Sequence, residues 1–256
     1  MANARRVRRP ARLSFRPVSD LPFSLLPGPA AILASVLDRE RKIDRALDSL
    51  GPLAGRDVAL IGGGTDETAR WTAAAARLIS VEALLPDDAI ALPDGSADAV
   101  VSAWSAFRGV DQSELDAADR ALRPAGRLLV VHDYGRDDVS RLRGDLPEYR
   151  TWSRRDGPFL ANGFRVRVIH CFWTFDTLDA AREFLADGFG AAGVEFGSDL
   201  KRPRLSYNVA VYHRTRGERA MSPDPAESQA IAAPVPVPAP VPAPVPAPAP
   251  GPADPA

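Results

Sequence analysis

The chain has 256 residues, of which 45% are hydrophobic and 25% charged, and its formal net charge is −1. This composition is that of an ordinary globular protein with one sizeable domain plus tails, or two small domains. The balanced charge gives no support for a nucleic-acid-binding protein. Cys171 is the single cysteine, which excludes an internal disulfide and a cysteine-based metal cluster.

Residues 1–27 form a predicted basic arm, because six arginines precede the first acidic residue, Asp20. Such a block of like charge is typical of a disordered, solvated segment; the alternative is an arm that contacts nucleic acid or anionic lipid. Prolines interrupt the apolar stretch 21–37, which is too short to span a bilayer, and no signal-peptide cleavage pattern follows it. We therefore expect a cytoplasmic protein with no membrane span.

Residues 28–216 alternate predicted helices and strands, which is typical of an α/β domain. Apolar spacing predicts one helix from 29 to 50. The predicted elements that follow are a strand at 57–61, a helix at 67–77, and strands at 78–81 and 99–103. Asp111 and Glu114 have the spacing of a helix start, and Pro124 and Gly126 end that helix near 122. A strand at 127–131 comes next.

The last third of the domain is richer in strand-forming residues. Residues 164–175 predict a long strand, and Asp176 is the expected cap of a helix over 177–187. Residues 205–213 alternate like an antiparallel edge strand. Together these elements predict a three-layer α/β sandwich with a mostly parallel sheet and an antiparallel last strand.

Residues 217–256 form a predicted disordered tail rich in proline, alanine and valine. Every second residue from 234 to 252 is proline, so this tract cannot join a helix or a sheet and should form an extended polyproline rod. Only Pro252 and Pro255 have the Pro-x-x-Pro spacing, so we expect a spacer rather than a ligand of SH3-type domains.

Gly62, Gly63 and Gly64 lie between a predicted strand and a predicted helix, where a nucleotide-containing cofactor commonly binds. The dinucleotide fingerprint would need a third glycine at the position of Glu67, and Asp66 adds a second carboxylate that a pyrophosphate would repel. The turn therefore disfavours NAD and FAD. S-adenosylmethionine has no phosphate and carries two cationic groups, so it tolerates these acids. The alternative is a tight turn that binds nothing.

Three segments resemble motifs of the class I S-adenosylmethionine-dependent methyltransferases, in particular those of type 11. Val58-Ala-Leu-Ile-Gly-Gly-Gly-Thr-Asp66 is similar to the family's Val-Leu-Asp-Leu-Gly-Cys-Gly-Thr-Gly. Residues 88–102 resemble its Asp-Ala-x-x-Leu-Pro-Phe-Pro-Asp-x-Ser-Phe-Asp-x-Val, and residues 119–130 its Arg-Val-Leu-Lys-Pro-Gly-Gly-x-Leu. The resemblance covers about residues 53–213 and implies a Rossmann-like fold with S-adenosylmethionine as cofactor.

The resemblance also implies which residues hold the cofactor. Gly62 and Gly64 would line its methionine portion. Asp66 departs from the family pattern, and it either stands in for the family's carboxylate or crowds the site with its bulkier side chain. Further along the chain, the family pattern assigns Glu82 to the ribose hydroxyls, Asp88 to the adenine amino group, the Ala89 backbone to the ring, and Ala103 and Trp104 to the methyl-donor end. For Glu82 and Asp88 the alternative is an ordinary solvated acid near a strand end.

Two departures from the family pattern affect this site. Leu60 replaces the acid that usually ends the first strand, and Asp66 replaces the last glycine of the turn. Only five residues separate Glu82 from Asp88, which is too few for a helical crossover, so the sheet is predicted to be shortened there. This would leave a sheet face exposed, and Phe23, Leu25 and Leu26 or a second subunit in a homodimer would cover it.

His132 is the candidate base for the acceptor substrate, because it follows a strand at the end where such sheets bind ligands. The alternative is a histidine that bonds a loop carbonyl. Four aromatic residues either line an acceptor pocket or belong to the core: Trp152, Phe159, Phe172 and Trp173. The three histidines are too scattered to predict a metal site.

The leading functional prediction is methyl transfer from S-adenosylmethionine to a small-molecule acceptor. The alternative from another class is a degenerate, non-catalytic methyltransferase fold that serves as a scaffold or regulatory protein. Glu67 disfavours a third interpretation, a nicotinamide-dependent oxidoreductase.

Overall fold

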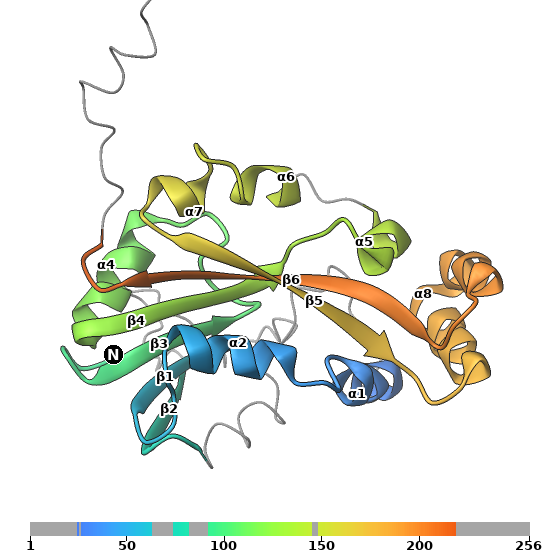
Figure 1. Ribbon diagram of the computed structural model, residues 1–256, viewed down its shortest axis with the longest axis horizontal. Coiled ribbons are helices and arrows are strands. Elements are labelled where there is room, and N and C mark those ends of the chain that lie inside the picture. The colour runs from blue at the N-terminus through green and yellow to red at the C-terminus, as the bar shows by residue number, and fades with distance from the viewer. Residues whose placement is uncertain (1–24, 26, 63–73, 82–91, 145–147, 219–256) are drawn as a thin grey trace, which may run out of the picture. The chain divides into compact units, whose positions relative to one another are not determined.

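The computed structural model describes residue 25 and residues 27–62, 74–81, 92–144 and 148–218 (Figure 1). The helices and strands, in chain order, are α1 (Pro27–Val36), α2 (Lys42–Leu50), β1 (Asp57–Gly62), β2 (Arg77–Val81), β3 (Ala97–Ala103), α4 (Gln112–Ala121), β4 (Leu122–Asp133), α5 (Asp138–Arg143), α6 (Glu148–Trp152), α7 (Pro158–Ala161), β5 (Arg165–Thr174), α8 (Leu178–Asp199) and β6 (Arg204–Thr215). No helix in these described ranges is long and apolar enough to cross a membrane.

The strands form one six-stranded sheet in the order β2-β1-β3-β4-β6-β5. The first four are parallel, and β6 runs antiparallel to both of its neighbours. The predicted α/β class, with a mostly parallel sheet and an antiparallel last strand, is therefore confirmed. Residues 205–213 alternate like an edge strand, but β6 lies between β4 and β5 and is hydrogen-bonded on both sides, so it is a last strand inserted antiparallel into the sheet.

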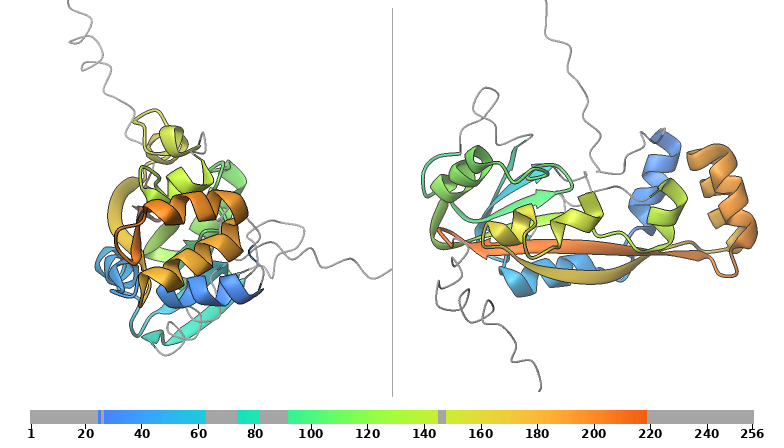
Figure 2. Two further views of the ribbon diagram at one scale, coloured as in Figure 1. Left: turned by 90° about the vertical axis from the view of Figure 1, so that its right-hand side faces the viewer. Right: turned by 90° about the horizontal axis from the view of Figure 1, so that it is seen from above.

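Helices cover both faces of the sheet, which gives three layers (Figures 1 and 2). Alternate residues of each strand face opposite cores. In β1, Val58 and Leu60 join the core formed with α1, α2, α5 and α8, whereas Ala59 and Ile61 join the core formed with α4, Trp152 and Phe159. Figure 2 shows the β5–β6 ribbon extending beyond the other strands toward α8.

The single helix predicted from 29 to 50 is two helices in the structure. The chain leaves α1 at Leu37, which forms an isolated antiparallel bridge with Trp173 of β5. The Asp38 carboxylate then accepts hydrogen bonds from the backbone N–H groups of Lys42 (3.0 Å) and Ile43 (2.7 Å), and so satisfies the first turn of α2. The apolar spacing continues through this break, so periodicity alone did not reveal it.

At the starts of α8 and α4, the capping residues differ from those predicted. Thr177, not Asp176, caps α8, because its hydroxyl accepts the N–H of Ala180, while Asp176 forms an exposed ion pair with Arg39. At α4, the Asp111 side chain makes no capping hydrogen bond. The Glu114 carboxylate instead accepts the N–H groups of Asp111 and Phe107, and its burial raises the pKa of Glu114.

Helix α8 runs to Asp199, well beyond the predicted end at 187. It consists of two helical segments joined at Gly190, whose φ of 57° and ψ of −134° are not helical. A side chain at Gly193 would overlap the carbonyl of Leu185, so the second segment packs closely against the first. The short helices α5, α6 and α7 were not predicted, because each is too short to show an apolar period.

Several predictions fall on residues outside those described, namely the arm at 1–24, the helix at 67–73, the segment 82–91 and the tail at 219–256. Arg77 belongs to β2 and not to the preceding helix. No described strand pairs with the outer edge of β2. Leu25 packs against Gly188 of α8. The prediction that Leu25 covers the β2 side of the sheet is therefore wrong.

Candidate functional site

The carboxyl ends of β1 and β3 form a close backbone junction. Gly62, the last residue of β1, pairs in register with Ala103 and has a φ of +69°. The loop after β3 folds back over it, and the Ser105 hydroxyl donates to the carbonyl of Ile61 at 2.8 Å. A Cβ at Gly62 would lie 2.5 Å from the Ser105 Oγ and 2.9 Å from the Ala103 carbonyl oxygen, so only glycine fits here.

Trp104 anchors this loop to the next strand. Its backbone N–H donates to the carbonyl of Val131 in β4 at 2.9 Å, and its φ of 49° lies in the left-handed region. The indole Nε1 donates to the Asp133 carboxylate at 3.0 Å. Trp104 is 9% exposed, so most of the ring is packed in the core and the loop has a fixed position.

Asp133, the last residue of β4, is the centre of a buried polar network. Its carboxylate accepts the Trp104 indole N–H and the Tyr207 hydroxyl of β6, and it forms an ion pair of 2.5 Å with Arg143 of α5. The side chains of both Asp133 and Arg143 are 2% exposed. The network therefore ties β3, β4, β6 and α5 together at the carboxyl edge of the sheet.

Sequence reasoning missed this network. Asp133 shares the strand-end position of His132 but is a weaker candidate for a base, and no sequence pattern points to Arg143 or Tyr207. Arg143 lies in a short helix that periodicity did not predict, and Tyr207 resembles any aromatic residue of a strand. The only available signal was the presence of an acid where the apolar run of β4 ends.

His132 is fully buried, with no exposed side-chain surface. Its Nε2 lies 3.0 Å from the carbonyl oxygen of Ala106, and its ring packs against Trp152 and Phe159. Because a carbonyl only accepts, Nε2 carries the proton and donates it. These surroundings are those of the alternative, a histidine bonded to a loop carbonyl, and not those of a solvent-accessible base.

The buried His132 makes stability depend on pH. Burial, with a smaller contribution from Arg108, lowers the pKa of His132 from its ordinary 6.5 to about 4. Between these values the unfolded chain binds a proton that the folded protein does not, so stability is lost as the pH falls from about 6.5 to 4. The expected total is about 3 kcal/mol, at up to about 1.4 kcal/mol per pH unit.

Urea unfolding at intervals from pH 7 to pH 4 measures this effect. His132→Gln keeps an amide N–H for the Ala106 carbonyl but does not titrate, so its stability should fall less steeply across the window. Equal slopes for the two proteins would show that His132 binds its proton as readily in the folded state as in the unfolded chain.

The four aromatic candidates lie in different places. Trp152 and Phe159 are buried beside His132, and Trp173 is buried in the opposite core against Phe184 and Tyr207. Phe172 lines a pocket at the end of β5. For three of the four, the core alternative is the one the structure supports.

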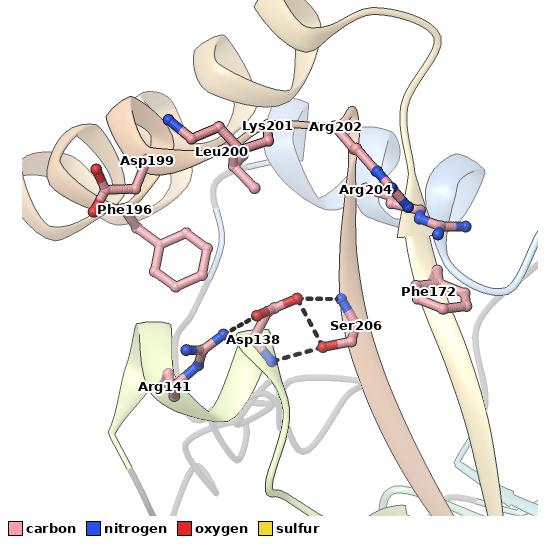
Figure 3. A pocket seen from close by; sticks show the side chains of 10 residues that line it. All are labelled: Asp138, Arg141, Phe172, Phe196, Asp199, Leu200, Lys201, Arg202, Arg204 and Ser206. Carbon is pink, nitrogen blue, oxygen red and sulfur yellow. Dashed lines mark hydrogen bonds and ion pairs between the residues drawn. The ribbon is translucent and has the colours of Figure 1, made fainter.

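That pocket, of about 510 Å³, lies where β5 ends and β6 begins (Figure 3). Since β6 is antiparallel to β4, its first residues lie at the same carboxyl edge as Gly62 and Asp133. Helix α5 and the C-terminal end of α8 complete the walls. The lining residues are Asp138, Arg141, Phe172, Phe196, Asp199, Leu200, Lys201, Arg202, Arg204 and Ser206.

The described residues fit a bound S-adenosylmethionine in part. At the junction of β1 and β3, the backbone of Gly62 pairs with Ala103, and the next residue, Trp104, is hydrogen-bonded to β4. The ends of β1, β3 and β4 therefore meet at the edge where ligands bind such sheets. Leu60 is fully buried in the core, so no carboxylate ends β1 at that position. Five of the predicted cofactor residues lie outside the described residues: Gly64, Asp66, Glu82, Asp88 and Ala89.

No protein-family model matches the chain, and no curated protein matches its sequence. Several solved structures are similar. The YcgJ protein from Bacillus subtilis is 15% identical, with 70% of this chain and 99% of that chain covered and a TM-score of 0.39. Geranyl diphosphate C-methyltransferase from Streptomyces coelicolor A3(2) is 16% identical to this chain. The match covers 69% of this chain and 79% of that chain, with a TM-score of 0.36.

A protein from Anaeromyxobacter dehalogenans described as a type II methyltransferase is 16% identical to this chain. The match covers 68% of this chain and 95% of that chain, with a TM-score of 0.43. At these identities and TM-scores, the likenesses identify no activity and no binding partner of this chain.

Proposed function

We propose that this chain transfers a methyl group from S-adenosylmethionine to a small-molecule acceptor. The observation that carries the proposal is the junction of Gly62 with the loop after β3, at the carboxyl edge of the sheet. The motif resemblance around Gly62 and the position of β6 between β4 and β5 support it. The small-molecule acceptor, a homodimer and a cytoplasmic location remain predictions.

When bound, S-adenosylmethionine supplies a methyl group activated by a positively charged sulfur. Direct displacement at that methyl mainly requires that the acceptor be held in line. In the proposed site, the backbones of Gly62 and Ala103 line one wall. The Asp133 network fixes Trp104 at the methyl-donor end, and His132 is a positioning residue that holds the Ala106 carbonyl.

A second candidate is a non-catalytic scaffold with this fold. The observation that favours it is the end of β1, where the buried Leu60 stands in place of an acid and Ser105 packs over Gly62. Such an end provides no carboxylate for the cofactor's ammonium group within the described residues. The two candidates differ in whether the cofactor binds at all.

Isothermal titration with S-adenosylmethionine, and with its demethylated product, distinguishes the two candidates. We expect binding that Glu82→Ala weakens about ten- to a hundredfold, because a charge-assisted hydrogen bond contributes about 1.5–3 kcal/mol. Glu183→Ala on the exposed side of α8 removes the same charge elsewhere and should leave the affinity unchanged. Absence of heat and of any thermal shift at millimolar cofactor would favour the scaffold.

A further inference from the structure

The floor of the pocket is one face of the β5–β6 ribbon. Phe172 pairs in register with Ser206, and Arg204 lies two residues before Ser206, so all three side chains share a face. The opposite face carries Trp173, Leu205 and Tyr207, all buried in the core. The ribbon is therefore firmly anchored on one side and offers a mixed apolar and cationic surface on the other.

The pocket has an excess of positive charge. Four lining side chains are cationic and two are anionic, which leaves a net charge of +2. Asp138 is already engaged, since it accepts the N–H and the hydroxyl of Ser206 at 2.8 and 2.7 Å and pairs with Arg141 (Figure 3). Although burial acts to raise it, these bonds hold the pKa of Asp138 below its ordinary value.

The remaining cations are less engaged, although Arg204 lies close enough to the Glu40 carboxylate to help lower the pKa of Glu40. Lys201, Arg202 and Arg204 form no ion pair with any of the residues that the structure describes. The guanidinium of Arg204 instead lies 4.6 Å from the centre of the Phe172 ring. Arginine presents a planar fork of N–H donors that suits carboxylate and phosphate oxygens. The cationic side chains at this end of the pocket can therefore bind an anion.

Three of the lining side chains are apolar, namely Phe172, Phe196 and Leu200, while Asp199 is the second anion of the pocket. Phe196 and Leu200, from the end of α8, lie across the pocket from Phe172 (Figure 3). The volume of about 510 Å³ falls in the usual range for sites that hold small organic ligands. Burying a flat apolar group between these side chains would remove its surface from water, which adds affinity beyond that of the charges.

We propose that this pocket binds an organic anion with a flat apolar body. Its carboxylate or phosphate faces Arg202 and Arg204, and its ring packs against Phe172. The pocket lies at the same edge of the sheet as Gly62, so the ligand is the acceptor if methyl transfer is correct. That assignment rests on the proposed function, whereas binding itself does not.

Titration calorimetry without any cofactor tests the binding. The probes are 2-naphthoate, 2-naphthyl phosphate, the neutral 2-naphthalenemethanol and inorganic phosphate. We expect both naphthyl anions to bind at least tenfold more tightly than the neutral alcohol and than inorganic phosphate. The ratio between the two naphthyl anions distinguishes a carboxylate ligand from a phosphate ligand.

Arg202→Ala and Arg204→Ala should each weaken naphthoate or naphthyl phosphate binding at least tenfold. Arg155→Ala, which removes an exposed arginine outside the pocket, is the matched control and should have no effect. Circular dichroism checks that each variant is folded. Equal affinity for naphthoate and the alcohol, or equal affinity of the Arg204 and Arg155 variants, would overturn the proposal. Anion binding by a chain that does not bind S-adenosylmethionine would refute methyl transfer alone.

Discussion

Replacing Asp133 by asparagine is expected to lower the free energy of unfolding by about 3–5 kcal/mol. The amide has nearly the shape of the carboxylate but carries no charge, so the Arg143 guanidinium, 2.5 Å away and almost fully buried, loses the anion it faces. Leaving one partner of a buried ion pair without its countercharge is strongly destabilising. Chemical denaturation followed by circular dichroism measures the change.

Asp176→Asn is the matched control, because it breaks an aspartate–arginine pair in an exposed setting. Asp176 and Arg39 lie 2.6 Å apart, but their side chains are 80% and 37% exposed. Water and salt screen such a pair, so the expected loss is about 0–1 kcal/mol. If the two variants lose the same stability, burial does not determine the contribution of Asp133. In Asp133→Leu/Arg143→Met, which removes both charges, we expect part of the loss to be recovered.

Gly62→Ala is expected to destabilise the fold and to abolish S-adenosylmethionine binding. The new methyl group meets Ser105 at 2.5 Å and the Ala103 carbonyl at 2.9 Å, and alanine is strained at a φ of +69°. The strain alone costs about 1–3 kcal/mol, and the overlap adds to it because the neighbouring backbone must move. Denaturation and titration calorimetry give the two readouts.

Gly55→Ala separates these two causes. Gly55 has nearly the same φ, +67°, but nothing lies within 4 Å of where its Cβ would be. This variant should show the strain without the overlap and should leave cofactor binding intact. If Gly62→Ala is no worse than Gly55→Ala in stability and in binding, the packed junction is not where the cofactor binds.

The positions of the strands along the chain were predictable because each strand is an apolar run bounded by turn residues. Residues 57–61, 99–103 and 164–175 were predicted within about two residues of β1, β3 and β5. The break at Asp38 was not predictable, because it depends on contacts that the apolar period does not encode. A side chain that bonds two N–H groups and a bridge to Trp173 both involve the folded chain.

Of the candidate site, only the glycine turn at the end of β1 could be predicted from the sequence; the roles of its side chains could not. Gly62 could be identified, because a glycine after a buried strand has a recognisable physical role. The roles of His132 and Asp133 could not be separated, since both follow the same strand. Only the fold shows that one side chain bonds Ala106 and the other pairs with Arg143 of a different element. The pocket combines three distant segments, which no local pattern can reveal.

The interior position of β6 also has a consequence for how the chain folds. Val130 of β4 pairs with Tyr212 of β6. The chain between them includes β5 and α8, which span the 35 residues from Arg165 to Asp199 and must be placed before that pairing is complete. Contacts between residues so far apart in sequence form slowly. Until residues 204–215 arrive, one edge of β4 presents unpaired backbone groups, which are prone to pair with other chains. During synthesis, the middle of the sheet is thus completed last.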